Sequence, residues 1–138
     1  MTTAPSHDIV VVDTDVISFI VKGDTRAALY QRHLLGNLKF VAAQTRAELE
    51  QWALLRNWGP RRLSGLRTFL SGYVFAEVDE TICLKWAEAR VNAQRAGRPI
   101  SVADAWVAAT ALGYAAPLVT HNPDDFQGVS GLAVITEK

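Results

Sequence analysis

Four acidic residues of this chain could do chemistry together: Asp13, Glu48, Asp104 and Asp125. Each lies where a predicted element begins or on its apolar face, and a carboxylate there is unfavourable unless a cation meets it. Two carboxylates about 4 Å apart repel by roughly 4 kcal/mol at an effective dielectric constant near 20. If these acids converge, a divalent metal ion has to neutralise them. Oxygen-only ligands favour Mg²⁺ or Mn²⁺ over Zn²⁺, so we predict a Mg²⁺ or Mn²⁺ site.

Asp13 and Glu48 differ in how well a structural role alone explains them. Asp13 follows a predicted strand, so either it or Thr14 could simply cap the next helix. Glu48 falls in line with Trp52 and Leu55, at positions i, i+4 and i+7 of a predicted helix. A glutamate is rarely left on a packed face without a partner. Glu48 is therefore harder to explain without a site.

Asp104 and Asp125 each have a structural explanation as well. The segment from Ser101 to Asp104 matches a capping box, in which the Asp104 carboxylate reaches back to the Ser101 amide. Asp125 follows Asn122-Pro-Asp, where turn chemistry accounts for some of the polar residues. Asp104 nevertheless borders the core, because it leads an apolar stripe of Val107, Ala108 and Ala111. Jointly, the four acids favour a site.

Strands are expected to alternate with helices along the chain. The run Ile9–Val12 is β-branched without alternation, which is typical of a strand buried on both faces. Alternating strands and helices favour an α/β fold with a parallel sheet that is covered on both sides. The other expected strands are Lys39–Ala43, Tyr73–Val78, Pro117–Thr120 and Leu132–Thr136, and the expected helices are Val16–Val21, Asp24–Leu35, Gln44–Trp58, Arg61–Leu70, Asp79–Gly97 and Ser101–Gly113.

The acids fall near the carboxyl ends of the expected strands, which is where parallel sheets collect their ligands. Asp13 follows one strand directly, and the segment from Asn122 to Asp125 follows another. Glu48 and Asp104 lie near the starts of helices that follow turns. All four acids can therefore face the same rim of the sheet.

Composition is ordinary for a globular protein. The 138 residues suffice for one domain, expected over residues 1–138, and 49% hydrophobic with 20% charged residues excludes disorder. The formal net charge of zero leaves no global basic footprint for nucleic acid. A local basic cluster is present, and it is either a solvated helix face or a phosphate contact: Arg56, Arg61, Arg62 and Arg67.

Cysteine usage and the N-terminal segment indicate where the protein acts. Cys83 is the single cysteine, so no internal disulfide can form, and we expect it to pack as a small apolar residue. Met1–Asp8 is short and polar, so we expect neither a signal peptide nor a membrane span there. We predict a cytoplasmic protein that does not associate with a membrane.

Four segments resemble, in order, the motifs of PIN-domain ribonucleases. Together with the single-domain length, they are most similar to the VapC toxins of bacterial type II toxin–antitoxin pairs. The resemblance implies a PIN-like α/β/α sandwich, in which helices flank a central, mostly parallel sheet. The segments are Val10–Ser18, Thr45–Leu49, Ser101–Leu112 and Leu118–Phe126.

The resemblance implies metal-dependent endonucleolytic cleavage of RNA, often transfer or ribosomal RNA. Mg²⁺ or Mn²⁺ would be held chiefly by Asp13 and Asp104, with Glu48 completing the pocket. The fourth motif offers two candidates, Asn122 and Asp125. If Asn122 faces the metal, one negative charge is missing, and a second metal ion is then in question. Asp15 adds a charge close to the site.

The same residues suit phosphodiester hydrolysis without the family name. A bound Mg²⁺ lowers the pKa of its water ligand and clamps the phosphate. Glu48 would be a ligand or a base that orients water, and water attack would leave a 5′-phosphate and a 3′-hydroxyl. His121 could contact phosphate or base, although we expect an exposed turn residue. Hydroxyl donors to the carboxylates are available at Thr14, Ser18 and Thr120.

The first half of the chain carries more bulky apolar residues than one small core clearly needs. Either a protein partner covers part of them, or all of them pack in the core. In VapC-like proteins an antitoxin docks there and the toxins usually form dimers. We therefore expect an RNA substrate, a cognate antitoxin and a homodimer or hetero-oligomer. The residues concerned are Phe19, Ile20, Tyr30, Leu34, Leu35, Trp52 and Trp58.

Two alternatives compete with the nuclease. In a haloacid-dehalogenase-like phosphatase, Asp13 would be the nucleophile and Asp15 the acid and base. That family also needs a lysine on the later rim, where none is well placed, and Glu48 would have no role. A PIN-like binding module with a decayed site is the other alternative, and the presence of the three main acids argues against it.

Overall fold

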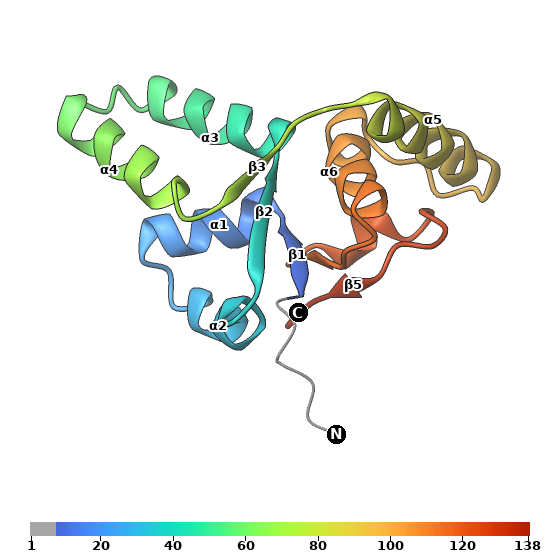
Figure 1. Ribbon diagram of the computed structural model, residues 1–138, viewed down its shortest axis with the longest axis horizontal. Coiled ribbons are helices and arrows are strands. Elements are labelled where there is room, and N and C mark those ends of the chain that lie inside the picture. Colours follow the sequence, from blue (N-terminus) through green and yellow to red (C-terminus); the bar gives the residue numbers. More distant parts are fainter. Residues whose placement is uncertain (1–7) are drawn as a thin grey trace.

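A five-stranded, all-parallel sheet lies at the centre of the protein, in the order β3-β2-β1-β4-β5 (Figure 1). The computed structural model describes residues 8–138, so the prediction for Met1–Asp8 lies outside the described residues except at Asp8. The strands are β1 (Ile9–Val12), β2 (Leu38–Ala42), β3 (Val74–Ala76), β4 (Leu118–Val119) and β5 (Val134–Ile135). The helices are α1 (Thr14–Lys22), α2 (Ala27–Leu34), α3 (Ala43–Leu55), α4 (Pro60–Leu70), α5 (Glu80–Arg95) and α6 (Val102–Gly113), with a 3₁₀ turn, η1 (Pro123–Phe126).

The middle strand β1 is buried on both faces, as its β-branched sequence predicts. Val11 belongs to a core shared with α5 and α6, whereas Val10 and Val12 belong to a core shared with α1 to α4. Figure 1 shows these two groups of helices on opposite sides of the sheet. The α/β/α sandwich is therefore confirmed. No helix within residues 8–138 is long and apolar enough to cross a membrane.

The strand expected over Tyr73–Val78 is shorter than predicted. β3 covers Val74–Ala76 and pairs with β2 alone, at the edge of the sheet. The chain then leaves the sheet and crosses its upper end toward α5, on the opposite side (Figure 1). The residues after Ala76 are used for this crossing and cannot continue the ladder.

Two predictions about buried helix faces were wrong. Leu55 is 74% exposed, and α3 instead buries Thr45, Leu49 and Ala53. Glu48 consequently lies at the border of the core face and not in its middle. Cys83 is exposed, because α5 turns its alanines toward the core and Cys83 away from it.

Gly128, just after η1, packs where no side chain fits. A Cβ atom there would lie 2.4 Å from the Arg98 carbonyl oxygen and 3.0 Å from the Cα of Ala93. We expect Gly128→Ala to lower the free energy of unfolding by about 1–3 kcal/mol, measured by urea denaturation. Gly65→Ala is the control, since nothing lies within 4 Å of that position in α4, and it should stabilise by about 0.5–1 kcal/mol. Equal effects of the two substitutions would contradict this packing.

Candidate active site

Asp13 and Thr120 meet at the carboxyl ends of two adjacent parallel strands. Val12 of β1 is paired with Val119 of β4, and the Asp13 N–H donates to the Val119 carbonyl over 2.9 Å. The residues that follow these strands therefore lie side by side. The Thr120 hydroxyl donates to Oδ2 of Asp13 over 2.8 Å and is fully buried. The expected convergence of these two segments on one rim is confirmed.

Asp13 is both a helix cap and a member of the site. It is the N-cap of α1, and its Oδ1 accepts a hydrogen bond from the Thr14 N–H over 2.8 Å. Its side chain is nevertheless only 8% exposed, and part of it lines an open cavity. Of the two capping candidates, Asp13 and not Thr14 takes the role. The capping role therefore does not remove Asp13 from the cavity wall.

A cavity of about 290 Å³ brings the predicted residues together. It lies between the segment that follows β1, the start of α6, helix α3 and the turn η1. Thr120 is the one predicted site residue that does not line it, because it is buried beneath Asp13. The lining residues are Asp13, Thr14, Asp15, Ser18, Glu48, Asp104, Asn122 and Asp125.

The hydroxyl of Thr14 joins the first helix to the third. It donates to Oε1 of Glu48 over 2.8 Å and lies 3.1 Å from the Thr45 hydroxyl. Thr45 is fully buried on the core face of α3, so the pair holds Glu48 at the edge of the cavity. Asp104 is in the first turn of α6, where the Ser101 hydroxyl accepts a hydrogen bond from its N–H over 3.0 Å. The Asp104 carboxylate lines the cavity.

Asp15 belongs to the site, although it was absent from the predicted site residues. Its Oδ2 accepts hydrogen bonds from the His121 N–H over 3.0 Å and from Nδ2 of Asn122 over 2.9 Å. Its Oδ1 accepts from the Val16 N–H over 2.7 Å. Asp15 thus ties the loop after β4 to the start of α1. The signal in the sequence was its position two residues after Asp13, which indicated an additional charge but not this anchoring.

His121 is not the exposed turn residue that the sequence suggested. Its ring meets Phe19 and Tyr30 edge to face, with centroids 5.2 and 5.7 Å away. Its Nδ1 lies 2.5 Å from the hydroxyl of Tyr30, and Tyr30 is completely buried. The Tyr30 hydroxyl also accepts a hydrogen bond from the Glu137 N–H over 3.1 Å. His121 therefore fixes the site loop to the core.

Burial raises the pKa of three carboxyl groups of the cavity, those of Asp13, Asp15 and Asp104. Burial, and then the charge of Asp15, raise the pKa of Asp13 from 3.8 to about 7, although hydrogen bonds from Thr120 and Thr14 oppose the shift. Burial also raises the pKa of Asp15. The pKa of Asp104 is raised by burial and by the charges of Asp125 and Asp15. Within residues 8–138 none of the cavity acids forms an ion pair. The site therefore carries excess negative charge that a cation would relieve.

The donor set fits a hard divalent cation. Every polar side-chain donor on the cavity wall offers oxygen: carboxylates, hydroxyls and the Asn122 amide. In the part of the chain that the structure describes, no three acidic, histidine or cysteine side chains are already arranged to hold a metal ion. Mg²⁺ usually keeps several water ligands and takes one or two carboxylates, so a complete protein cage is not required.

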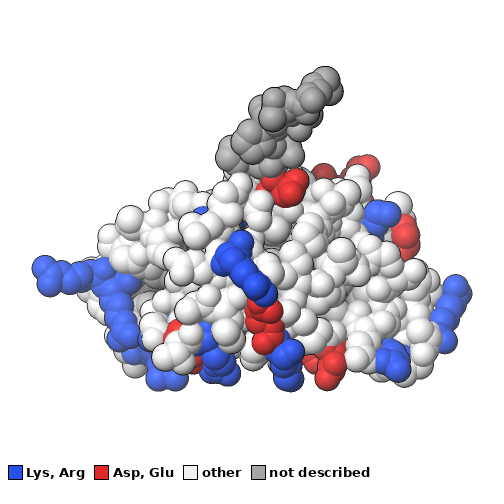
Figure 2. Space-filling model, turned by 90° about the horizontal axis from the view of Figure 1, so that it is seen from below, with Lys and Arg blue, Asp and Glu red and all other residues white. Residues whose placement is uncertain are grey.

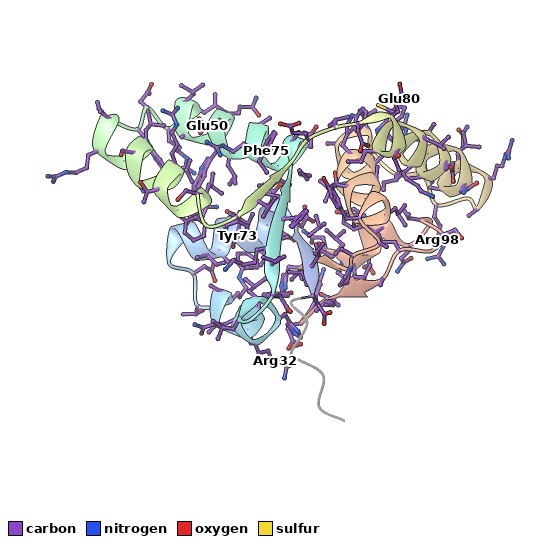
Figure 3. All side chains as sticks on the ribbon, in the orientation of Figure 1. Arg32, Glu50, Tyr73, Phe75, Glu80 and Arg98 are labelled. Atoms are coloured by element: carbon purple, nitrogen blue, oxygen red, sulfur yellow. The ribbon has the colours of Figure 1, made fainter. Side chains whose placement is uncertain are left out.

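The basic cluster is only partly free. Arg67 forms an ion pair with Glu50 of α3, over 2.8 Å, and Arg62 lies over the ring of Trp58. Figure 3 shows Glu50 between α3 and α4. On the face seen in Figure 2, acidic side chains are interspersed among the basic ones. Glu50 therefore balances part of the charge of the basic cluster.

Comparison with known proteins identifies what the chain is similar to. A family model described as "PIN domain" matches residues 10–132. Ribonuclease VapC1 of Haemophilus influenzae (strain R2866) is 28% identical over 126 residues, which are 90% of this chain and 94% of that protein. VapBC2 from Rickettsia felis bound to a promoter DNA fragment has a TM-score of 0.83 at 20% identity, with 94% of this chain and 99% of that chain covered. VapBC-1 from nontypeable Haemophilus influenzae has a TM-score of 0.79 at 24% identity, with 93% and 97% covered.

Proposed function

Because this chain belongs to the PIN domain family, we propose that it is a divalent-metal-dependent endoribonuclease of the VapC kind, active in the cytoplasm. The observation that carries the proposal is the convergence of Asp13, Asp15, Glu48, Asp104 and Asp125 on one cavity whose acids form no ion pair among the described residues. The similarity to a ribonuclease along nine-tenths of the chain supports RNA as the substrate.

Each cavity residue has a proposed task. Asp13 and Asp104 hold Mg²⁺ or Mn²⁺, and Glu48 is either a further ligand or the group that orients the attacking water. When bound, the metal ion acidifies a water ligand and neutralises charge on the phosphate. Thr120 and Thr14 hold the carboxylates of Asp13 and Glu48 in place.

The fourth position of the site is shared by Asn122 and Asp125. The Nδ2 atom of Asn122 donates a hydrogen bond to Asp15. The amide oxygen of Asn122 is then the side-chain atom that can coordinate a metal ion or accept a hydrogen bond from a bridging water. Asp125 is exposed at the cavity edge and supplies a charge that Asn122 lacks. We propose that Asp125 holds a second metal ion or a bridging water. Ser18 lines the same cavity and offers it a hydroxyl group.

The purified protein tests this function directly. We expect it to cut single-stranded RNA when Mg²⁺ or Mn²⁺ is present and to stop when EDTA is added. Water attack should leave 5′-phosphate and 3′-hydroxyl ends, which end-specific ligation and sequencing distinguish. Cleavage that continues undiminished in EDTA, or that leaves a 2′,3′-cyclic phosphate, would contradict the mechanism.

The phosphatase alternative finds little support in the cavity. No lysine lines it, and the Nζ atoms of Lys22 and Lys39 lie over the rings of Trp52 and Tyr73. A phosphatase would form a covalent phosphate on Asp13 and leave RNA intact. Mass spectrometry of the protein after exposure to a phosphomonoester would detect that adduct.

A cognate antitoxin is the proposed protein partner. Phe19, Tyr30 and Leu34 are buried and belong to the core, but Leu35 is 69% exposed. Between α1 and α4 lies a cavity of about 320 Å³ lined by Ile20, Val21, Trp58, Arg62, Gly65, Leu66 and Phe69. We propose that an apolar antitoxin segment fills it and that the complex contains a toxin dimer.

A growth experiment tests whether the protein is a toxin. Expression of this protein alone should arrest growth, and co-expression of the neighbouring gene product should restore growth. Harmless accumulation would argue against a toxin.

A further inference from the structure

A second cavity, of about 260 Å³, lies between α3 and α6. Val78, in the connection from β3 to α5, contributes to its wall, and Figure 3 shows this connection between Phe75 and Glu80. None of the roles described above uses this cavity. Its lining residues are Ala43, Gln44, Ala47, Val78, Trp106 and Thr110.

The two cavities are built on the same two helices. On α3, Gln44 of the second cavity and Glu48 of the acidic cavity are four residues apart, so their side chains share one side of the helix. On α6, Asp104 and Trp106 are two residues apart, so their side chains point to different sides of that helix. The side of α3 that carries Gln44 and Glu48 therefore connects the two cavities, and a ligand with a phosphate in the acidic cavity could extend along this side into the second cavity.

The wall of the second cavity suits a flat, uncharged ring. The Trp106 ring stacks on Trp86 with centroids 5.1 Å apart and an angle of 23°, and Nε1 of Trp86 donates to the Val102 carbonyl over 3.3 Å. These contacts hold Trp106 in place as a rigid aromatic wall. None of the lining residues is charged.

Gln44 supplies the free polar group of this wall. Its side-chain amide forms no hydrogen bond with any other residue of the described chain, whereas the Thr110 hydroxyl donates to the Trp106 carbonyl over 2.8 Å. An amide that both donates and accepts can pair with the edge of a nucleobase. Aromatic side chains beside such groups are how proteins bind unstacked bases of single-stranded RNA.

We propose that the Trp106 cavity is a nucleobase subsite, which binds a base adjacent to the phosphate that is cut. This inference rests on the proposed ribonuclease function. The neutral aromatic base stacks against Trp106 and meets the Gln44 amide, while its phosphate enters the acidic cavity. The position of this cavity next to the acidic cavity along α3 favours a nucleotide over a peptide, because a nucleotide joins a neutral ring to an anionic group.

Binding of RNA in an uncleavable background tests the subsite. With Asp13→Asn as the parent, fluorescence anisotropy would measure the affinity for a short, mixed-sequence single-stranded RNA in Mg²⁺. We expect Trp106→Ala to weaken binding by about tenfold and Trp106→Phe to retain most of it, because phenylalanine keeps an aromatic face. Tyr114→Ala is the matched control, since Tyr114 is a partly exposed aromatic residue at the far end of α6 that lines none of the three cavities described.

An abasic scan of the same RNA supplies a readout that a folding defect does not imitate. In the parent protein, replacing one base at a time by hydrogen should weaken binding at one position, next to the cleaved phosphate. In Trp106→Ala, removal of the base at this position should no longer change the affinity. Unchanged affinity of Trp106→Ala, or a scan identical in both proteins, would overturn the subsite. Loss of antitoxin binding with RNA binding intact would assign the cavity to a protein and also overturn it. Failure of the wild type to cut RNA at all would instead reject the proposed function.

Discussion

Asp13→Asn is expected to reduce RNA cleavage by more than about 100-fold while the fold is retained. Loss of a group that merely orients a metal ligand already costs about 10–100-fold, and Asp13 is proposed as a ligand itself. The amide oxygen of asparagine can still accept the hydrogen bond from the Thr14 N–H, and its Nδ2 can donate to the Thr120 hydroxyl, so the cap of α1 is kept. Initial cleavage rates at saturating Mg²⁺ would measure the effect, and circular dichroism would check the fold.

The matched control for this substitution is Asp124→Asn. Asp124 is exposed in η1, accepts a hydrogen bond from Gln127 and does not line the acidic cavity. The same change of charge at this position should leave the cleavage rate within about twofold of wild type, since long-range surface charge is largely screened at physiological salt. Equal losses in the two variants would mean that net charge, and not the geometry around Asp13, controls cleavage.

The metal-free protein should become less stable as pH rises, and Asp13 should be the main cause. Because burial and Asp15 raise its folded-state pKa from 3.8 to about 7, the folded state holds a proton that the unfolded state has lost. The associated stability is fully present below about pH 4 and is lost as the pH rises through about 7. The loss should be on the order of 2–4 kcal/mol. The raised pKa values of Asp15 and Asp104 act in the same direction.

Urea denaturation in EDTA between pH 4 and pH 8 measures this dependence. Asp13→Asn should lack most of the decline, so it should be more stable than wild type at pH 8 although it is inactive. Mg²⁺ at about 100 times its dissociation constant should return about 2.7 kcal/mol to the wild type at pH 8 and much less to the variant. A wild-type stability that stays level across this pH range would contradict the charge crowding inferred for the cavity.

The architecture was largely predictable because it depends on local patterns. The β-branched run Ile9–Val12 identified the central strand, and strands alternating with helices identified a parallel sheet. Parallel strands bring their carboxyl ends to one rim, so Asp13 and the segment after β4 could be placed together before any coordinates were known. The expectation that residues 1–138 form one domain stays a prediction.

The errors concern helix faces and distant contacts. Their size suggested that Trp52 and Leu55 mark the buried side of α3; Trp52 does pack against the core, but Leu55 is exposed and Thr45, Leu49 and Ala53 are the buried residues. Cys83 was misplaced for a similar reason, because α5 buries its neighbour Ile82 together with Ala89 and Ala93. A residue's size and hydrophobicity alone do not determine which side of a short helix faces inward.

Asp15 and His121 could not be assigned from the sequence, because their partners are distant along the chain. The Asp15 carboxylate meets the loop after β4, which is more than 100 residues away. His121 is fixed by Tyr30, which is 91 residues away. Such contacts follow from the order of the strands in the sheet. The periodicity of apolar residues along the sequence predicts individual strands and helices but not this order.

A crystal soaked in Mn²⁺ and measured at the manganese absorption edge tests the central claim most directly. We predict an anomalous peak in the acidic cavity, within bonding distance of carboxylate oxygens of Asp13 and Asp104, and its loss in Asp13→Asn. No anomalous peak in the cavity at millimolar Mn²⁺ would contradict the assignment. A peak elsewhere in the protein, with none within bonding distance of the Asp13 and Asp104 carboxylates, would also contradict it.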